Sequence, residues 1–113
     1  MNNTNNIQLT KRSIEFLARK NHAMLIGGKW CASSNGATLA VHNPADESLL
    51  GSVPAATEAD VDTAVGAARQ AFESAAWGRM RPDQRQRLLL RLADLVEEHA
   101  KTLAEIESLD NGK

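Results

Sequence analysis

The side chains that most often catalyse reactions or bind metals are few and scattered in this sequence. The histidines His22, His42 and His99 lie far apart and lack the spacing of a zinc site. Cys31 is the only cysteine, so no disulfide can form within the chain. Beside Trp30 it is typical of a small apolar packing residue rather than a nucleophile. The sequence therefore predicts neither a zinc centre nor a catalytic cysteine.

The sequence also contains no motif that indicates phosphate binding or acid–base catalysis. Gly27-Gly28-Lys29 matches neither the dinucleotide fingerprint nor the P-loop spacing, and it is more typical of a plain turn. The carboxylates of the C-terminal third are spread around two expected helices, as solvated residues are: Glu97, Glu98, Glu105, Glu107 and Asp110. No catalytic or cofactor-binding residue is assigned.

A basic cluster lies near the middle of the chain, with arginines at 79, 81, 85, 87 and 91. Nucleic-acid binding would favour one basic face with interleaved aromatic residues. At about 100° per residue, Arg87 and Arg91 instead point away from the neighbouring leucines, whereas Arg85 lies in line with them. We interpret the cluster as a solvated surface with an ion pair.

Composition sets the broad class. The chain has 113 residues, 42% hydrophobic and 24% charged, with a net charge of -1, which predicts about one domain and no electrostatic attraction to nucleic acid or membranes. No uncharged stretch is long enough to cross a bilayer. A lone cysteine gives no sign of an oxidising compartment, so the expected location is cytoplasmic.

The elements that would position these residues begin with residues 1–23, which we interpret as a disordered tail and an N-terminal helix. The Asn-rich stretch Met1–Asn6 has almost no apolar side chains and is expected to be disordered. A short helix is predicted over Thr10–Lys20, with Thr10 or Ser13 as its cap. A basic mitochondrial presequence is the less favoured alternative for this segment.

The stretch from Met24 to Pro54 has the pattern of β structure. Gly27-Gly28 accepts the positive φ of a tight hairpin turn between two short apolar runs. Further strands are predicted at Thr38–His42 and Leu49–Val53, separated by the turn-forming Asn43-Pro44-Ala45-Asp46. We expect a small antiparallel meander.

Three amphipathic helices are predicted to follow. Thr57 and Asp60 form a near capping box for the first, and Pro82 suits the first position of the second. Gly112 suits the end of the third. The predicted fold is α/β, a meander followed by three helices, and a chain this short would struggle to cover the apolar faces of all its elements.

Residues 24–113 resemble the opening blocks of aldehyde dehydrogenases. Five sequence blocks carry the resemblance in order and spacing: Met24–Trp30, Val41–Asp46, Ala59–Val65, Ala68–Phe72 and Glu107–Lys113. The lead-in Phe16–His22 is similar to that of bacterial phenylacetaldehyde dehydrogenases, which implies an arylacetaldehyde substrate. Arg81 departs from the pattern, because Ser or Thr commonly stands before this proline.

The resemblance implies that residues 24–113 are the incomplete N-terminal part of the cofactor-binding domain of an NAD- or NADP-dependent enzyme. Such enzymes oxidise an aldehyde to an acid through a cysteine thiohemiacetal, hydride transfer to nicotinamide and water attack assisted by a glutamate. Those groups belong to later parts of a longer subunit. This chain alone is expected to be inactive, and the full-length subunit to form a homo-oligomer.

One binding site of the family, for an alkali cation, includes residues within 24–113. Many members hold an alkali cation near the strand before Asn-Pro, and the resemblance maps its ligands onto the carbonyls of Val41 and His42 and the carboxylate of Asp110. The alternative for Asp110 is an ordinary surface residue at a helix end.

Three functional hypotheses remain from the sequence. The favoured one is a part of a functional dehydrogenase whose substrate is a small-molecule aldehyde. The second is a non-catalytic truncated product that aggregates through its leucine-rich helix. The third is a small interaction module that uses the same leucine face to bind a partner helix.

Overall fold

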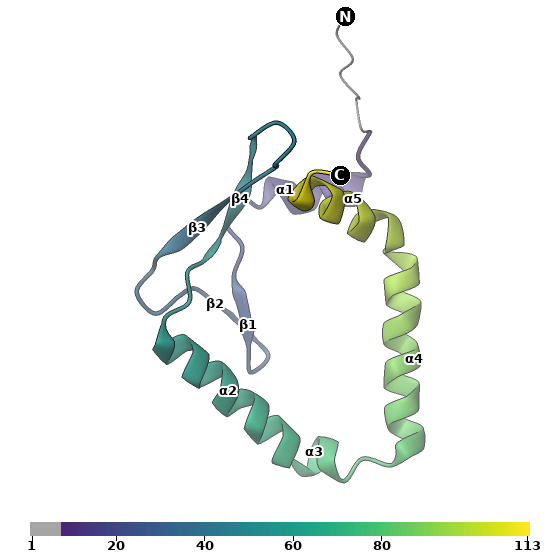
Figure 1. Ribbon diagram of the computed structural model, residues 1–113. Helices are drawn as coiled ribbons and strands as arrows, with labels where there is room; N and C mark the ends of the chain where they lie inside the picture. The colour runs from purple at the N-terminus through teal and green to yellow at the C-terminus, as the bar shows by residue number, and fades with distance from the viewer. Residues whose placement is uncertain (1–7) are drawn as a thin grey trace, which may run out of the picture.

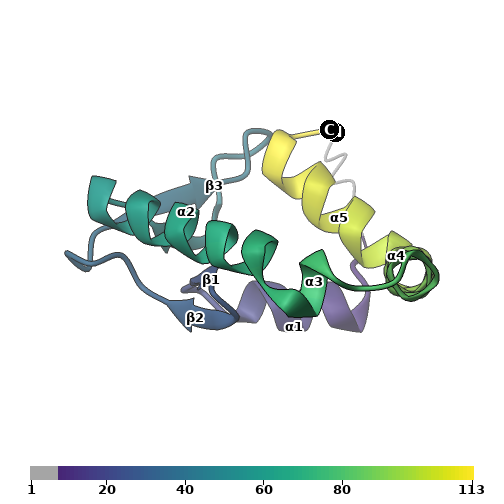
Figure 2. The same cartoon turned by 90° about the horizontal axis from the view of Figure 1, so that it is seen from below.

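The computed structural model describes residues 8–113, and the disorder predicted for Met1–Asn6 lies outside this range. The helices and strands follow one another around an open loop, with α1 and α5 side by side where it closes (Figure 1). In chain order the elements are α1 Lys11–Ala18, β1 Met24–Ile26, β2 Lys29–Cys31, β3 Thr38–His42, β4 Leu49–Pro54, α2 Glu58–Glu73, α3 Ala75–Gly78, α4 Pro82–Glu98 and α5 Ala100–Asn111. Figure 2 shows α4 end-on beside α5, so the chain turns sharply between these helices.

The first hairpin forms as its glycines predict. β1 and β2 pair antiparallel, with Ile26 opposite Lys29 and a two-residue turn between them. Gly27 and Gly28 have φ of 58° and 77°, the positive values that a primed hairpin turn requires and that side chains disfavour. The pair is therefore a hairpin turn, as the sequence predicted.

The strands form two separate two-stranded sheets, β1-β2 and β3-β4, where the sequence predicted one meander. The chain bends between them because the segment after β2 closes on itself. Ser33 Oγ donates to the Ala37 carbonyl at 2.7 Å, and the Ala37 N–H donates to Asn35 Oδ1 at 2.9 Å. β3 therefore leaves this turn without pairing with β2.

The helix starts match the expected caps. Thr10 is the N-cap of α1. Thr57 and Asp60 form a complete capping box on α2, and Pro82 opens α4. At α4 the Arg81 N–H donates to Gln84 Oε1 at 3.3 Å, but an arginine side chain has no acceptor to return the bond. That start is therefore half-capped, at the position where Arg81 departs from the family pattern.

The segment before β1 runs along the outer edge of β4. The Ser52 N–H donates to the Lys20 carbonyl at 2.8 Å, and the His22 N–H donates to the Ser52 carbonyl at 2.9 Å. Such pairing satisfies backbone groups that an edge strand leaves open. The chain between α1 and β1 is therefore fixed to the second sheet.

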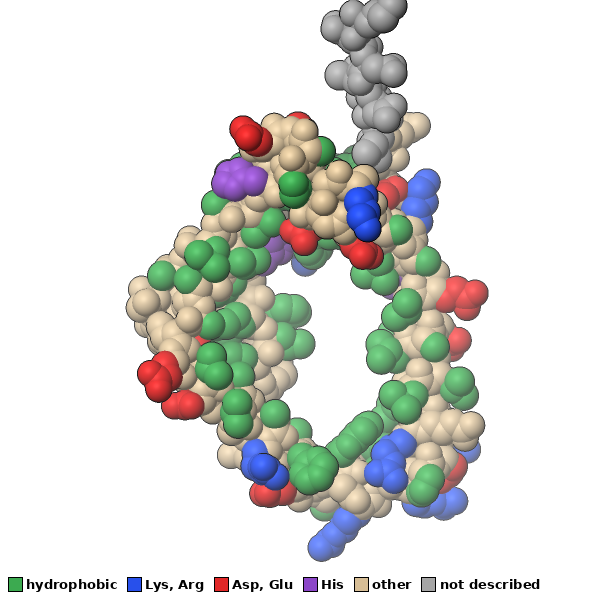
Figure 3. Space-filling view, in the orientation of Figure 1, with side chains coloured by type: hydrophobic (Ala, Val, Ile, Leu, Met, Phe, Trp, Pro, Cys, Tyr) green, Lys and Arg blue, Asp and Glu red, His purple; other side chains and the backbone are tan. Residues whose placement is uncertain are grey.

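Hydrophobic side chains gather around an opening instead of filling a core (Figure 3). Within residues 8–113 no hydrophobic side chain is fully buried, and Leu89 of α4 is 60% exposed. The radius of gyration is 18.0 Å, against about 13 Å for a compact domain of similar length. No helix of the described part is long and apolar enough to cross a membrane. The expected difficulty in covering the apolar faces is confirmed.

Candidate functional site

The predicted cation ligands lie where β3 meets the C-terminal end of α5. Val41 and Asp110 line the same cavity, of about 860 Å³, whereas the exposed side chain of His42 does not. His42 was predicted to contribute only its backbone carbonyl, so the direction of its imidazole does not bear on the site. Two strand carbonyls and one carboxylate are oxygen ligands, which hard cations prefer.

The end of α5 approaches the turn after β3 very closely. Gly112 has φ of 77°, and a Cβ placed on it would lie 3.1 Å from Pro44 Cβ and 3.3 Å from the Ala45 nitrogen. Any larger residue would therefore press against that turn. Asn43 stabilises the turn from within, because its buried side chain accepts a hydrogen bond from the Ala45 N–H at 2.9 Å. The structure thus brings together two motifs separated by more than sixty residues.

A β-bulge lies at the same point of the strand. Val41 pairs with Gly51 and His42 with Leu49, which leaves Leu50 as the extra residue. Bulges disrupt the regular ladder and redirect nearby backbone groups. The irregularity falls at the two residues whose carbonyls are predicted ligands. Within the described residues no cluster of three His, Cys, Asp or Glu side chains could hold a metal, so a site here would depend on backbone oxygens.

The cavity beside this site has mostly apolar walls from α1, β2, β3, β4 and α5. Phe16 and Leu17 come from α1, and Leu103 and Ile106 come from α5. The imidazole of His22 stacks on the ring of Phe16 with centroids 4.7 Å apart, an arrangement typical of packing rather than catalysis. Cys31 is half-buried, with its Sγ 3.7 Å from the Met24 carbonyl.

Glu105 is a polar residue whose role no sequence pattern indicated. Its Oε2 accepts hydrogen bonds from the Thr10 N–H at 3.0 Å, from Thr10 Oγ1 at 2.8 Å and from Ser13 Oγ. Ser13 is fully buried. The bond from Ser13, followed by those from Thr10, lowers the pKa of Glu105 from its ordinary value. Ser13 and Thr10 precede Glu105 by 92 and 95 positions in the sequence, so no local pattern could reveal these contacts.

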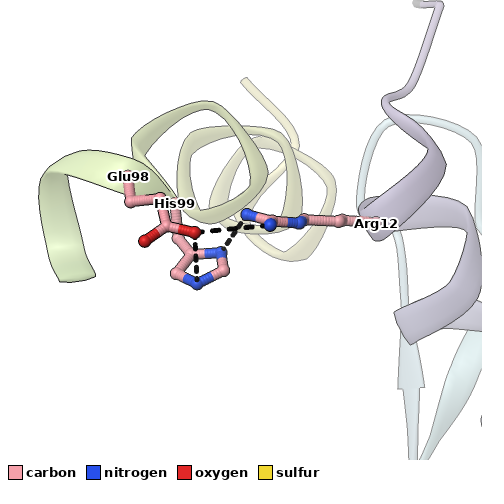
Figure 4. Close-up of polar contacts among 3 residues, drawn as sticks. All are labelled: Arg12, Glu98 and His99. Atoms are coloured by element: carbon pink, nitrogen blue, oxygen red, sulfur yellow. Dashed lines mark hydrogen bonds and ion pairs between the residues drawn. The ribbon is translucent and has the colours of Figure 1, made fainter.

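A second polar contact joins α1 to the junction of α4 and α5 (Figure 4). Arg12 Nη1 lies 2.8 Å from His99 Nδ1, and Arg12 Nη2 lies 3.4 Å from Glu98 Oε1. Since arginine only donates, Nδ1 of His99 must accept.

In the basic cluster Arg81 pairs with Asp83 at 3.1 Å, in agreement with the interpretation of a solvated surface that includes an ion pair.

Comparison with known proteins gives consistent matches along the chain. The model of the aldehyde dehydrogenase family matches residues 30–113. A putative aldehyde dehydrogenase of Bacillus subtilis is 47% identical over 107 residues, which are 95% of this chain and 21% of that protein. The phenylacetaldehyde dehydrogenase of Pseudomonas fluorescens is 49% identical over 92 residues, 81% of this chain and 18% of that protein. The chain therefore spans about a fifth of the length of these relatives.

Solved structures agree with the sequence matches. The G224D mutant of an aldehyde dehydrogenase from Bacillus cereus superposes with a TM-score of 0.89 at 44% identity, covering 95% of this chain and 22% of that one. The NAD⁺ complex of aldehyde dehydrogenase from Bacillus cereus gives 0.84 at 42% identity, covering 90% and 21%. The open arrangement of elements is thus found within much larger folded subunits.

Proposed function

Because this chain belongs to the aldehyde dehydrogenase family, we propose that it forms the N-terminal part of a longer NAD(P)-dependent subunit that oxidises an aldehyde to its carboxylic acid. The observation that carries this proposal is the uncovered apolar surface. Leu88, Leu89 and Leu92 of α4 are each more than half exposed, and a helix with such a face normally packs against another element. Further protein that covers these faces would supply the missing core.

In this subunit the residues described here would have a structural role. The nicotinamide cofactor supplies the hydride acceptor, and NAD is favoured by the NAD⁺ complex of the similar Bacillus cereus protein. No residue of this chain is assigned to the reacting groups. Its elements would instead form one wall of the domain that holds the cofactor. We further propose that the complete enzyme is a cytoplasmic homo-oligomer, which light scattering and cell fractionation would test.

The test compares residues 1–113 with the full gene product, meaning whatever polypeptide the gene encodes. Circular dichroism and size-exclusion chromatography are recorded for both. We expect the 113-residue chain to melt without cooperativity, to aggregate and to form no NADH from any aldehyde, whereas the full product melts cooperatively and forms NADH. A compact 113-residue species with cooperative melting would overturn the proposal and favour an independent interaction module.

The finer proposal for the substrate is an arylacetaldehyde. It is supported by the 49% identity with the Pseudomonas fluorescens phenylacetaldehyde dehydrogenase and by the similar lead-in at Phe16–His22. In the full gene product we expect kcat/KM for phenylacetaldehyde to exceed that for acetaldehyde by about tenfold or more, because an aromatic ring buries much more apolar surface. Equal values, or a preference for acetaldehyde, would contradict this substrate class.

We also propose that the carbonyls of Val41 and His42 and the carboxylate of Asp110 bind an alkali cation. The cavity shared by Val41 and Asp110, and the bulge at Val41 and His42, support it. K⁺ or Na⁺ should raise the Tm of the full gene product relative to choline at equal ionic strength. Asp110→Asn should abolish that difference, and Glu107→Gln is the matched control on the same helix. An unchanged cation effect in Asp110→Asn would exclude Asp110 as a ligand.

A further inference from the structure

Helix α1 is attached to the rest of the chain by a small number of polar contacts. Ile14 is 55% exposed and Phe16 is 38% exposed, so apolar packing of this short helix is incomplete. An isolated helix of 8 residues is not stable in water. Its folded state therefore depends on contacts with distant parts of the chain.

Glu105 supplies the most concentrated of these contacts. One carboxylate oxygen accepts from the backbone and side chain of Thr10 and from the side chain of Ser13. Thr10 is the N-cap of α1 and Ser13 lies in its first turn, so the negative charge also stands at the positive end of the helix dipole. Ser13 is 0% exposed, which means that the loss of this acceptor would leave a buried hydroxyl without its partner.

We propose that Glu105 is an ionisable latch, which holds α1 against α5 while its carboxylate is charged and lets α1 detach when it is neutral. Since Phe16 and Leu17 of α1 and Leu103 and Ile106 of α5 line the same cavity, detachment removes one wall of that cavity. The latch thus controls access to the cavity that contains Asp110. Every polar contact of the latch lies within residues 8–113, so its test does not depend on which reaction the full gene product performs.

The charged groups around the latch come from three elements. Lys101 of α5 lies near Glu105 and favours its charged form. On α1, Lys11 pairs with Glu15 at 3.8 Å. Arg12 contacts His99 and Glu98 at the end of α4. The lowered pKa of Glu105 places release of the latch below its ordinary value of 4.5.

Hydrogen exchange with mass spectrometry on the full gene product tests the latch. We compare the protection of backbone amides against hydrogen exchange in α1 with that in the middle of α4. The ratio of the two separates local release of α1 from global unfolding. At neutral pH we expect Glu105→Gln to lower this ratio by about tenfold, and Glu105→Ala by more, because a charge-assisted bond is stronger than a neutral one. Glu107→Gln, with the same loss of charge two positions away, should leave the ratio unchanged.

The pH dependence gives a second, independent readout. After correction for intrinsic exchange rates, the wild-type ratio should fall on acidification below the ordinary glutamic acid pKa, whereas the already low ratio of Glu105→Ala should stay flat. Unchanged α1 protection in both Glu105 variants would overturn the proposal. An equal fall of the α1-to-α4 protection ratio in Glu107→Gln would also overturn the proposal. Loss of any negative charge on α5 would then be enough to release α1.

Discussion

At the scale of single residues, Gly51 shows how closely separate segments approach. A Cβ at this position would lie 2.8 Å from the Lys20 carbonyl oxygen and 3.5 Å from His22 Nε2. The nearer atom belongs to the backbone, which is itself fixed by the hydrogen bond from the Ser52 N–H. A side chain at position 51 must therefore displace the segment before β1.

Gly51→Ala should destabilise the full gene product by about 1–3 kcal/mol, the usual cost of inserting a group into a close-packed site. Denaturant unfolding measures the effect. Gly66→Ala is the matched control, because within residues 8–113 its added Cβ meets no atom within 4 Å apart from its chain neighbours and its own helix backbone. Alanine is also favoured over glycine in a helix interior by about 0.5–1 kcal/mol. Equal stability of Gly51→Ala and wild type would show that the contact is looser than described.

Residues with local signals were predicted well, and those with distant partners were not. Thr10, Thr57 and Gly27-Gly28 act on neighbours within a few positions, so the cap and turn patterns indicated their roles correctly. Glu105 was grouped with solvated carboxylates, because its partners lie more than ninety residues away. The nearness of Val41 and Asp110 was suggested only by the family resemblance, since it depends on how α5 returns to β3.

At the scale of elements, α2 illustrates a helix start that also fixes a loop. Asp60 accepts from the Thr57 N–H at 2.9 Å and from the Ser34 N–H at 3.1 Å. Ser34 and Thr57 hydroxyls also lie 2.7 Å apart. The sequence predicted the capping box but not the link to the turn before β3. The same turn separates β2 from β3, which explains why the strands form two sheets and not the single predicted meander.

Thr57→Ala should lower the free energy of unfolding by about 1 kcal/mol, because the helix loses the hydroxyl that accepts the hydrogen bond from the Asp60 N–H. Thermal or denaturant unfolding of the full gene product would measure this. Thr63→Ala serves as the control, because among residues 8–113 the Thr63 hydroxyl donates only to the Ala59 carbonyl of its own helix, at 2.8 Å. A loss as large in the control as in Thr57→Ala would show that the cap itself contributes little.

Stability at low pH should report on Asp60. Hydrogen bonds from the Thr57 backbone, then from the Ser34 backbone, lower its pKa below the ordinary value of 3.8. The folded state thus favours the carboxylate, and this contribution is complete above the unfolded-state pKa and is lost as the pH falls through the folded-state pKa. Wild type should therefore lose more stability than Asp60→Asn when the pH falls below about 3.8. Parallel pH profiles of the two proteins would contradict this.

At the scale of the whole molecule, the outstanding feature is an arrangement of well-formed elements around an apolar opening (Figure 3). The helices have local sequence signals, but within residues 8–113 their large apolar side chains stay partly exposed, as Leu88 and Leu89 of α4 do. Hydrophobic patterning predicted which faces should be covered, and chain length indicated that they could not all be covered from within. The sequence could not specify what covers them, because burial is a property of the complete fold.

The leucine face of α4 allows the most direct test of this arrangement. Leu92 is 57% exposed in residues 8–113. If further protein covers it, Leu92→Glu buries a charge without a partner and should destabilise the full gene product by at least about 3 kcal/mol. In the isolated 113-residue chain the same change meets water, so helicity should hold while aggregation and dye binding decrease. Arg87→Gln, the same change in charge on the opposite side of α4, should alter neither protein appreciably. A full gene product that tolerates Leu92→Glu as well as Arg87→Gln would mean that α4 stays exposed, and the proposed longer subunit would lose its main structural support.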